Sequence, residues 1–145
     1  MADADVPTPA DYPLHLPVQT RWADNDMFGH LNNAYYYALW DTVINNHMER
    51  EGGADPMRDP SFAVVAESSC TYVSELAYPQ LLVVGLGVER LGTSSITYRT
   101  ALWADGAAES DPVAAFGRWV HVYVDRRDRR STAIPAAMRA ALERL

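Results

Sequence analysis

The sequence predicts an α+β domain in which a five-stranded antiparallel sheet wraps around one long central helix, with a short helix at the C-terminus. Three observations predict this class. Residues 34 to 51 run without Pro or Gly, which gives a helix of roughly four turns or more. A strand-like run over residues 14–22 precedes that helix. Four further strand-like runs, separated by short turns, follow it at residues 62–74, 81–91, 95–103 and 113–125.

The length of 145 residues is most simply that of one domain. Residues 1–13 are rich in Pro, Asp and Ala without periodicity, which predicts a flexible N-terminal arm before a single domain at residues 14–145. Pro17 confines the first strand to an edge of the sheet or to a strand beginning there. Pro135 opens a short amphipathic tail, residues 136–145, which we expect to be the C-terminal helix.

Composition narrows the possible partners. The formal net charge is −7, and every basic residue is Arg, so an extended nucleic-acid surface is not expected. The single Cys70 rules out an intrachain disulfide, and the N-terminus lacks the basic and apolar regions of a signal peptide. The longest apolar stretch, residues 81–88, is far shorter than the ~20 residues of a membrane helix. We therefore expect a cytoplasmic protein that binds neither nucleic acid nor membrane.

The helix and the second long strand each suggest a neighbour. Apolar and aromatic side chains occur on nearly every side of the predicted helix, so we expect other structure to surround it. Gly85 and Gly87 lie two residues apart, on one face of their strand, which removes side chains where another element approaches closely. The helix is the expected neighbour of these two glycines.

The loop before the helix holds the candidate chemistry. It carries Asp24, Asp26 and His30, and the helix that follows begins at Asn32 or Asn33, either of which can accept from a free backbone N–H. Unpaired donors and a partial positive charge collect at a helix N-terminus, which can therefore bind an oxyanion. The alternative for both acids is a structural role in the turn.

The segment from Arg21 to Tyr36 reads RWADNDMFGHLNNAYY. It closely resembles the signature of the hotdog-fold acyl-CoA thioesterases of the 4-hydroxybenzoyl-CoA thioesterase type, in which an acid, two variable residues and Gly-His-Val-Asn-Asn precede the central helix. The resemblance covers about residues 14 to 127 and includes the chain order of strand, helix and four strands. Two departures are Leu31 in place of Val, and Gln80 followed by Leu81 where the family has Gly-Asp before its third strand.

The resemblance implies hydrolysis of an acyl- or aroyl-CoA to the free acid and CoA. It assigns the catalytic carboxylate to Asp26, which attacks the carbonyl carbon or activates water, and the oxyanion donor to the backbone N–H of Asn33. His30 is the third candidate of the catalytic group. It could be a base or a ligand, and the favoured interpretation is a structural histidine that holds the loop or contacts the substrate. Asp24 remains a turn residue, and Asp41 on the helix is the second choice for the catalytic acid, with structural pairing as the alternative.

The substrate would need a pocket for its acyl group and cations or hydroxyls for its phosphates. Tyr36 and Trp40 are the candidates for the acyl pocket, although core packing explains both equally well. The candidates for the CoA phosphates are the Arg-rich run at residues 126–130 and one turn, with a solvated charged turn as the alternative for any single Arg. The turn residues are Arg90, Thr93, Ser94 and Ser95. We expect no metal, since the loop lacks the separated second pair of ligands found in common zinc sites, and no cofactor beyond the CoA of the substrate.

Two other functions remain open on the same fold. One is a non-catalytic module that binds acyl-CoA or an acyl carrier, and the other is a hotdog hydratase or dehydratase. A single sheet of this kind leaves an unpaired edge and an apolar outer face, so we also expect a homodimer that assembles further to a homotetramer.

Overall fold

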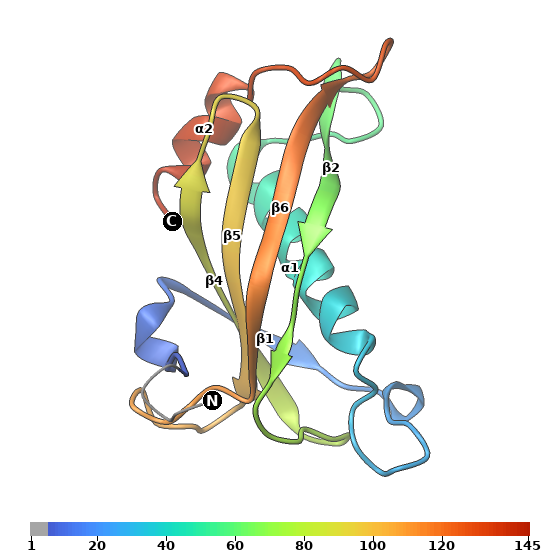
Figure 1. Cartoon of the computed structure of the whole chain (residues 1–145), viewed down its shortest axis with the longest axis vertical. Coiled ribbons are helices and arrows are strands. Elements are labelled where there is room, and N and C mark those ends of the chain that lie inside the picture. The colour runs from blue at the N-terminus through green and yellow to red at the C-terminus, as the bar shows by residue number, and fades with distance from the viewer. Residues whose placement is uncertain (1–5) are drawn as a thin grey trace.

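The computed structural model describes residues 6–145, and the part of the predicted arm at residues 1–5 lies outside this range. The long helix α1 spans Tyr35–Gly52 and the short helix α2 spans Ala136–Leu142. The α+β class is confirmed, and Figure 1 shows the strands alongside α1 with α2 near one end of the sheet. The strands are β1 (Leu14–Gln19), β2 (Ser61–Ser68), β3 (Thr71–Tyr72), β4 (Leu81–Leu91), β5 (Ser95–Ala104) and β6 (Ala115–Asp125).

The sheet has six strands, one more than predicted. Its order is β1-β4-β5-β6-β2, every pair in it is antiparallel, and β3 pairs with β6 beside the end of β2. The predicted run 62–74 is interrupted at Ser69 and Cys70, and β3 resumes pairing with β6 after the break. Pro17 lies in β1 at the edge of the sheet, as predicted, where its missing N–H costs no ladder bond on the open side.

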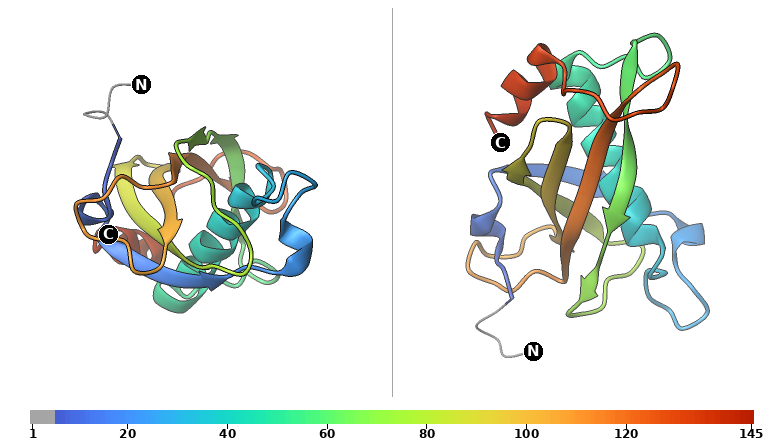
Figure 2. Two further views of the ribbon diagram at one scale, coloured as in Figure 1. Left: turned by 90° about the horizontal axis from the view of Figure 1, so that it is seen from below. Right: turned by 45° about the horizontal axis from the view of Figure 1, so that its top comes forward.

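The helix lies against one face of the sheet, which curves around it when seen end-on (Figure 2, left). Its buried residues form a single stripe with helical spacing, and the other side of α1 is exposed. The expectation that α1 is surrounded on all sides is therefore wrong for the single chain. Tyr35 and Tyr37 flank the stripe and are only partly buried. The stripe consists of Tyr36, Leu39, Trp40, Val43, Ile44, His47, Met48 and Gly52.

The two strand glycines face away from the helix, contrary to the prediction. A Cβ at Gly85 would come within 2.6 Å of the Trp103 ring, and one at Gly87 would come within 3.0 Å of Pro13. Alternation then directs Leu82, Val84 and Leu86 of β4 toward the helix. The close neighbours of the glycines are thus an aromatic ring and the N-terminal segment on the outer face.

The described part of the N-terminal arm packs on this outer face. A 3₁₀ turn, η2, spans Pro9–Asp11, and Tyr12 after it is buried against Trp103 with a ring separation of 6.1 Å. The backbone N–H of Val113 donates to the carbonyl of Pro7 at 3.0 Å. From residue 6 onward the arm is therefore part of the packed structure rather than separate from it.

The loop that holds Asp26 and the turn that follows Arg90 lie at opposite ends of the molecule. The loop between β1 and α1 lies at the end where α1 begins, whereas the β4–β5 turn lies at the opposite end, near α2 (Figure 1).

Neither helix among residues 6–145 has the length and apolarity required to cross a membrane.

Candidate active site at the start of the central helix

The loop between β1 and α1 consists of a 3₁₀ turn and a small hairpin. The turn, η3, spans Trp22–Asp24, and the hairpin is closed by an antiparallel bridge between Asn25 and Leu31. Inside it the N–H of Asp26 donates to the carbonyl of His30 at 2.9 Å. Gly29 takes a positive φ of 86°, a conformation that side chains disfavour, which explains a glycine at this point.

Asp24 is locked in place by Arg21. Its side chain is buried and accepts from the Arg21 backbone N–H at 2.7 Å and from the guanidinium at 2.8 and 3.0 Å. Burial opposes ionisation of this carboxyl, but the hydrogen bonds from Arg21 outweigh it and hold the pKa of Asp24 below its usual range. Every strong contact of Asp24 is internal, which agrees with its predicted role as a turn residue.

Asp26 is held more loosely. One carboxylate oxygen accepts from the N–H of Phe28 at 2.9 Å, and the other lies 3.6 Å from Nδ1 of His30. The His30 ring stacks on the exposed Phe28 ring at a centroid separation of 6.1 Å. The side chain of Asp26 is 18% exposed, so its second oxygen remains open to a small reactant while His30 restricts its orientation.

The backbone just before α1 presents a free donor. Asn32 forms a turn just before α1, whose N-cap residue is Ala34: the Asn32 side-chain oxygen accepts from the N–H of Ala34 and its carbonyl from the N–H of Tyr35, both at 2.9 Å. The N–H of Asn32 itself donates to the carbonyl of Asp24 at 2.8 Å. Within residues 6–145 the N–H of Asn33 has no acceptor, whereas its neighbours on both sides do. The predicted oxyanion donor is thus unpaired at the predicted place.

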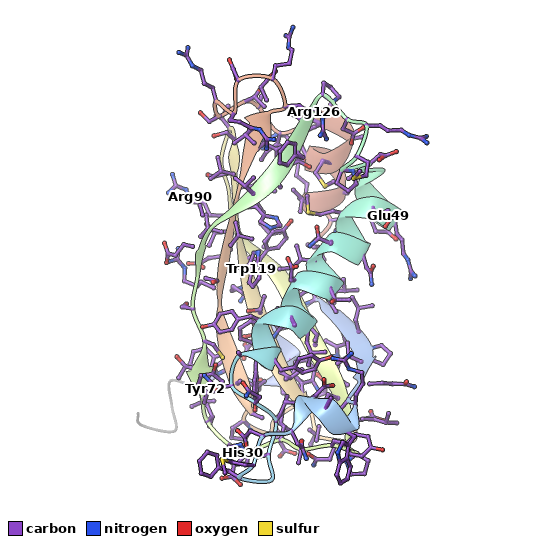
Figure 3. The ribbon with its side chains drawn as sticks, turned by 90° about the vertical axis from the view of Figure 1, so that its right-hand side faces the viewer. His30, Glu49, Tyr72, Arg90, Trp119 and Arg126 are labelled. Atoms are coloured by element: carbon purple, nitrogen blue, oxygen red, sulfur yellow. The ribbon has the colours of Figure 1, made fainter. Side chains whose placement is uncertain are left out.

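A hollow of about 330 Å³ opens at this point of the helix. It is lined by His30, Asn33 and Tyr36 together with Tyr72 of β3 and Glu75. Figure 3 shows His30 and Tyr72 at the same end of the molecule, far from Arg90 and Arg126. The sequence gives no motif for Tyr72 or Glu75, because both reach this place only through the pairing of β3 with β6.

Two predicted residues on the helix lie elsewhere. Trp40 has no exposed surface, and its indole N–H donates to the carbonyl of Ala101 at 3.1 Å, so it belongs to the core between helix and sheet. Asp41 is exposed, and its carboxylate accepts from the Asn45 amide at 2.9 Å within the helix. The structural alternatives raised for both residues are the ones that these contacts favour.

The turn residues predicted to bind the CoA phosphates lie at the opposite end of the molecule from the loop that holds Asp26. They occupy the end of β4, the turn and the start of β5, where the carbonyl of Thr93 accepts from the N–H of Ile134 and that of Ser94 from the N–H of Tyr123. The turn is therefore anchored by its backbone, and its side chains remain partly or fully exposed. In one chain Arg90, Thr93, Ser94 and Ser95 do not meet the loop that holds Asp26.

Arg126, the first residue of the Arg-rich run 126–130, is not free to bind a phosphate. Arg126 donates to the carbonyl of Asp59 at 2.8 Å and lies over the Phe62 ring at 4.9 Å, so it is committed to structure.

No group of three His, Cys, Asp or Glu side chains placed to hold a metal occurs among the residues from 6 onward.

Comparison with known proteins identifies the class. A model of the Thioesterase-like superfamily matches residues 20–142, which is most of the chain, and the chain therefore belongs to this superfamily. The match includes the whole loop, the helix and the hollow. The Thioesterase-like superfamily is a broader group than the 4-hydroxybenzoyl-CoA type suggested by the motif. No curated protein matches the chain.

Solved structures agree with this assignment. The PA5185 protein of Pseudomonas aeruginosa strain PAO1 is 42% identical, with a TM-score of 0.91 over 95% of this chain and 94% of that one. The PA2801 protein of Pseudomonas aeruginosa, which carries the provisional name of a thioesterase, is 30% identical with a TM-score of 0.80 over 88% and 95%. The SAV2348 protein of Staphylococcus aureus, solved in complex with CoA, shares the fold at 17% identity, with a TM-score of 0.79 over 89% and 80%. These likenesses confirm the predicted hotdog fold.

Proposed function

We propose that this protein is an acyl-CoA thioesterase that hydrolyses an acyl- or aroyl-CoA, with Asp26 as the reacting carboxylate. The observation that carries the proposal is the unpaired N–H of Asn33, which borders a hollow beside the loosely held Asp26–His30 pair. A thioester carbonyl placed in the hollow would meet a donor for its developing negative charge on one side. Asp26 does not itself line the hollow, but its carboxylate lies 3.6 Å from Nδ1 of His30, which does.

The chemistry follows from these positions. Attack on the thioester carbon moves negative charge onto its oxygen, which the Asn33 N–H and the partial positive charge of the helix end stabilise. His30 holds the orientation of Asp26 from 3.6 Å away. When the C–S bond breaks, the sulfur leaves as the thiolate of CoA and takes a proton from solvent.

The acyl group would contact tyrosine rings. Tyr36 and Tyr72 meet edge to face at a centroid separation of 5.0 Å, and both border the hollow. Aromatic walls of this kind favour an aromatic or a short to medium acyl group. The 4-hydroxybenzoyl-CoA type suggested by the motif is compatible with these walls.

A panel of acyl-CoAs tests the proposal, with release of CoA followed by thiol titration. We expect turnover of at least one aroyl- or short-chain acyl-CoA, and a kcat lowered by about 10²- to 10⁴-fold after Asp26→Asn. Saturable binding of every acyl-CoA without release of CoA would instead establish the non-catalytic alternative. Hydration of an enoyl-CoA would point to the hydratase branch.

Isotope labelling separates the two roles of Asp26. If the carboxylate attacks, an anhydride with the acyl group forms as CoA leaves, and water then cleaves it. Repeated turnover in ¹⁸O water places the label in the Asp26 carboxylate when water attacks Cγ of this anhydride, which activation of water by Asp26 cannot do, so labelled Asp26 establishes the covalent route. The mass of the proteolytic peptide that contains Asp26 reads out the difference.

We also propose a homodimer formed through the edge strand β2, and a homotetramer built from two such dimers. Val64 and Val65 on this strand are exposed, and β2 is a terminal strand of the sheet. Antiparallel pairing of two β2 strands about a twofold axis would bring the end of one chain that carries the β4–β5 turn toward the end of the other that carries the loop between β1 and α1. The turn with Arg90 would then approach the CoA end of the partner's site.

Light scattering after size-exclusion chromatography tests the assembly. The wild type should elute as a tetramer. The Val65→Glu variant should form a smaller assembly, with a lower molar mass and a weaker affinity for CoA. Arg90→Gln should raise the KM for acyl-CoA without changing the mass. A monomeric, fully active wild type would contradict this arrangement.

A further inference from the structure

Tyr72 of β3 forms a hydrogen bond to the backbone just before α1. Its hydroxyl donates to the carbonyl oxygen of Asn33 at 2.6 Å, a contact between residues 39 apart in sequence. Its side chain also lines the hollow, together with Asn33 and Tyr36. The peptide groups on both sides of the Asn33 Cα thus differ: the N–H is free, and the carbonyl is tied to β3.

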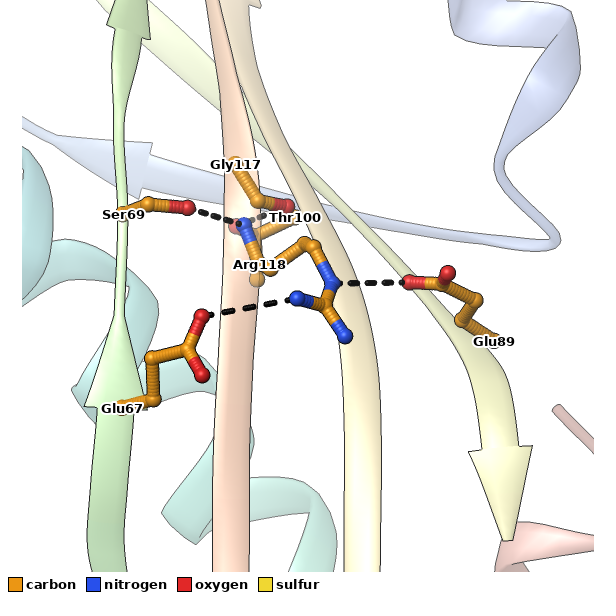
Figure 4. Close-up of polar contacts among 6 residues, drawn as sticks. All are labelled: Glu67, Ser69, Glu89, Thr100, Gly117 and Arg118. Carbon is orange, nitrogen blue, oxygen red and sulfur yellow. Dashed lines mark hydrogen bonds and ion pairs between the residues drawn. The ribbon is translucent and has the colours of Figure 1, made fainter.

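The position of Tyr72 is fixed by the sheet. Tyr72 pairs with Ala115 of β6, and its ring packs edge to face on Tyr36. Between β2 and β3 the Ser69 hydroxyl accepts from the backbone N–H of Arg118 at 3.3 Å, as Figure 4 shows. A Cβ added at Gly117 would collide with the carbonyl oxygen of Ser69. Glycine at 117 therefore lets the interrupted strand stay close to β6 and deliver Tyr72 to the helix start.

We propose that Tyr72 is a positioning residue of the active site, whose hydroxyl orients the Asn33 backbone so that the free N–H points into the hollow. This inference rests on the proposed thioesterase function. The segment that it holds lies outside the regular part of α1, which begins at Tyr35, so helix hydrogen bonds alone do not fix it.

Tyr72 does not act on the substrate as an acid. A phenol has one O–H proton, and that proton is used in the bond to Asn33. Tyr72 is partly exposed, and partial loss of water around its hydroxyl, followed by the contact with Cys70, raises the pKa of Tyr72, so the hydroxyl keeps its proton at neutral pH. The pH dependence of the reaction should therefore be unchanged when this hydroxyl is removed.

The variant Tyr72→Phe tests the proposal because it keeps the ring on Tyr36 and removes the hydroxyl alone. We expect kcat to fall about tenfold, since small misplacement of a catalytic group has large effects on rate. KM and the shape of the pH profile should stay as in the wild type. Tyr78→Phe is the matched control: Tyr78 is a half-exposed tyrosine whose ring contacts Trp22, and its hydroxyl forms no hydrogen bond within residues 6–145.

A second readout does not depend on activity. The amide resonance of Asn33 in the NMR spectrum of the free protein should shift in Tyr72→Phe and stay in place in Tyr78→Phe. Unchanged kcat together with an unchanged Asn33 resonance would overturn the proposal, as would a fall in kcat that merely follows a fall in melting temperature. If the wild type hydrolyses no thioester, the proposed function fails, while the Asn33 resonance still decides whether Tyr72 orients this backbone.

Discussion

The two halves of the loop before α1 treat similar carboxylates in opposite ways. In the 3₁₀ turn, Asp24 is buried and receives three hydrogen bonds from Arg21. In the hairpin two residues later, Asp26 receives one backbone hydrogen bond and has His30 at 3.6 Å. A carboxylate whose acceptor sites are filled stabilises the fold, whereas one with a free oxygen can react.

The comparison predicts its largest effect at Asp26. The amide of Asp26→Asn can still accept from the Phe28 N–H, so the hairpin should persist. Its loss of charge removes the nucleophile or base, and kcat should fall by about 10²- to 10⁴-fold. Hydrolysis of the best acyl-CoA measures this, with Asp105→Asn on an exposed turn as the control. If Asp41→Asn abolishes activity and Asp26→Asn does not, the acid on the helix is the catalyst.

Asp24 should show the opposite profile. Asp24→Asn removes the charge-assisted bonds to Arg21 and should lower the free energy of unfolding by about 1–3 kcal/mol, with a smaller effect on kcat than Asp26→Asn. Urea denaturation measures the first quantity and the thioesterase assay the second. A variant with wild-type stability and no activity would place Asp24 in the chemistry and break the comparison.

The acid dependence of stability adds a sharper test of Asp24. Its pKa is lowered in the folded state, so its contribution is fully present above the unfolded value of about 3.9. That contribution is lost as the pH falls through the folded pKa. The difference in unfolding free energy between the wild type and Asp24→Asn should therefore shrink as the pH is lowered below 4. A difference that stays constant down to the lowest pH at which the protein folds would show that the carboxylate charge is not what stabilises the turn.

The difference between these two acids could be predicted because it lies in a contiguous stretch. The Gly-His-Leu-Asn-Asn context after Asp26 separates it from Asp24 within a few residues, and the turn that Asn32 forms with Ala34 is local as well. Tyr72 could not be found in this way, because it reaches the site through pairing with Ala115 of a distant strand. Contacts between strands are set by register, which the local pattern near Tyr72 does not encode.

The two errors about faces have a related cause. Alternation along β4 divides its residues into two sets, but it does not say which set faces the helix, so Gly85 and Gly87 were assigned to the wrong side. On α1, Tyr35 and Tyr37 count as aromatic in the pattern, yet each lies partly exposed beside the buried stripe. Amphipathic side chains of this kind widen an apparent apolar surface without being surrounded.

His30 should have a smaller effect than Asp26. Its Nδ1 lies 3.6 Å from the Asp26 carboxylate, beyond a direct hydrogen bond, so it restricts the orientation of that group more than its charge. His30→Gln should lower kcat about three- to tenfold, within the range for misplacement of a catalytic group. A loss as large as that of Asp26→Asn would make His30 an equal partner in the reaction. The kcat of His30→Gln, measured beside that of Asp26→Asn on the same acyl-CoA, separates the two outcomes.

The smallest effect is expected at Gly29, which closes the hairpin with a φ of 86°. A Cβ there meets no atom within 4 Å, so Gly29→Ala costs only the backbone strain of a left-handed residue, about 1 kcal/mol. Because the hairpin holds Asp26, the strain should reduce kcat slightly while leaving Asp24 and its turn unaffected. Gly29→Asn should be closer to wild type, since Asn tolerates this conformation better than Ala. If Ala and Asn at 29 lower kcat equally, the hairpin needs the freedom of glycine during turnover rather than its conformation at rest.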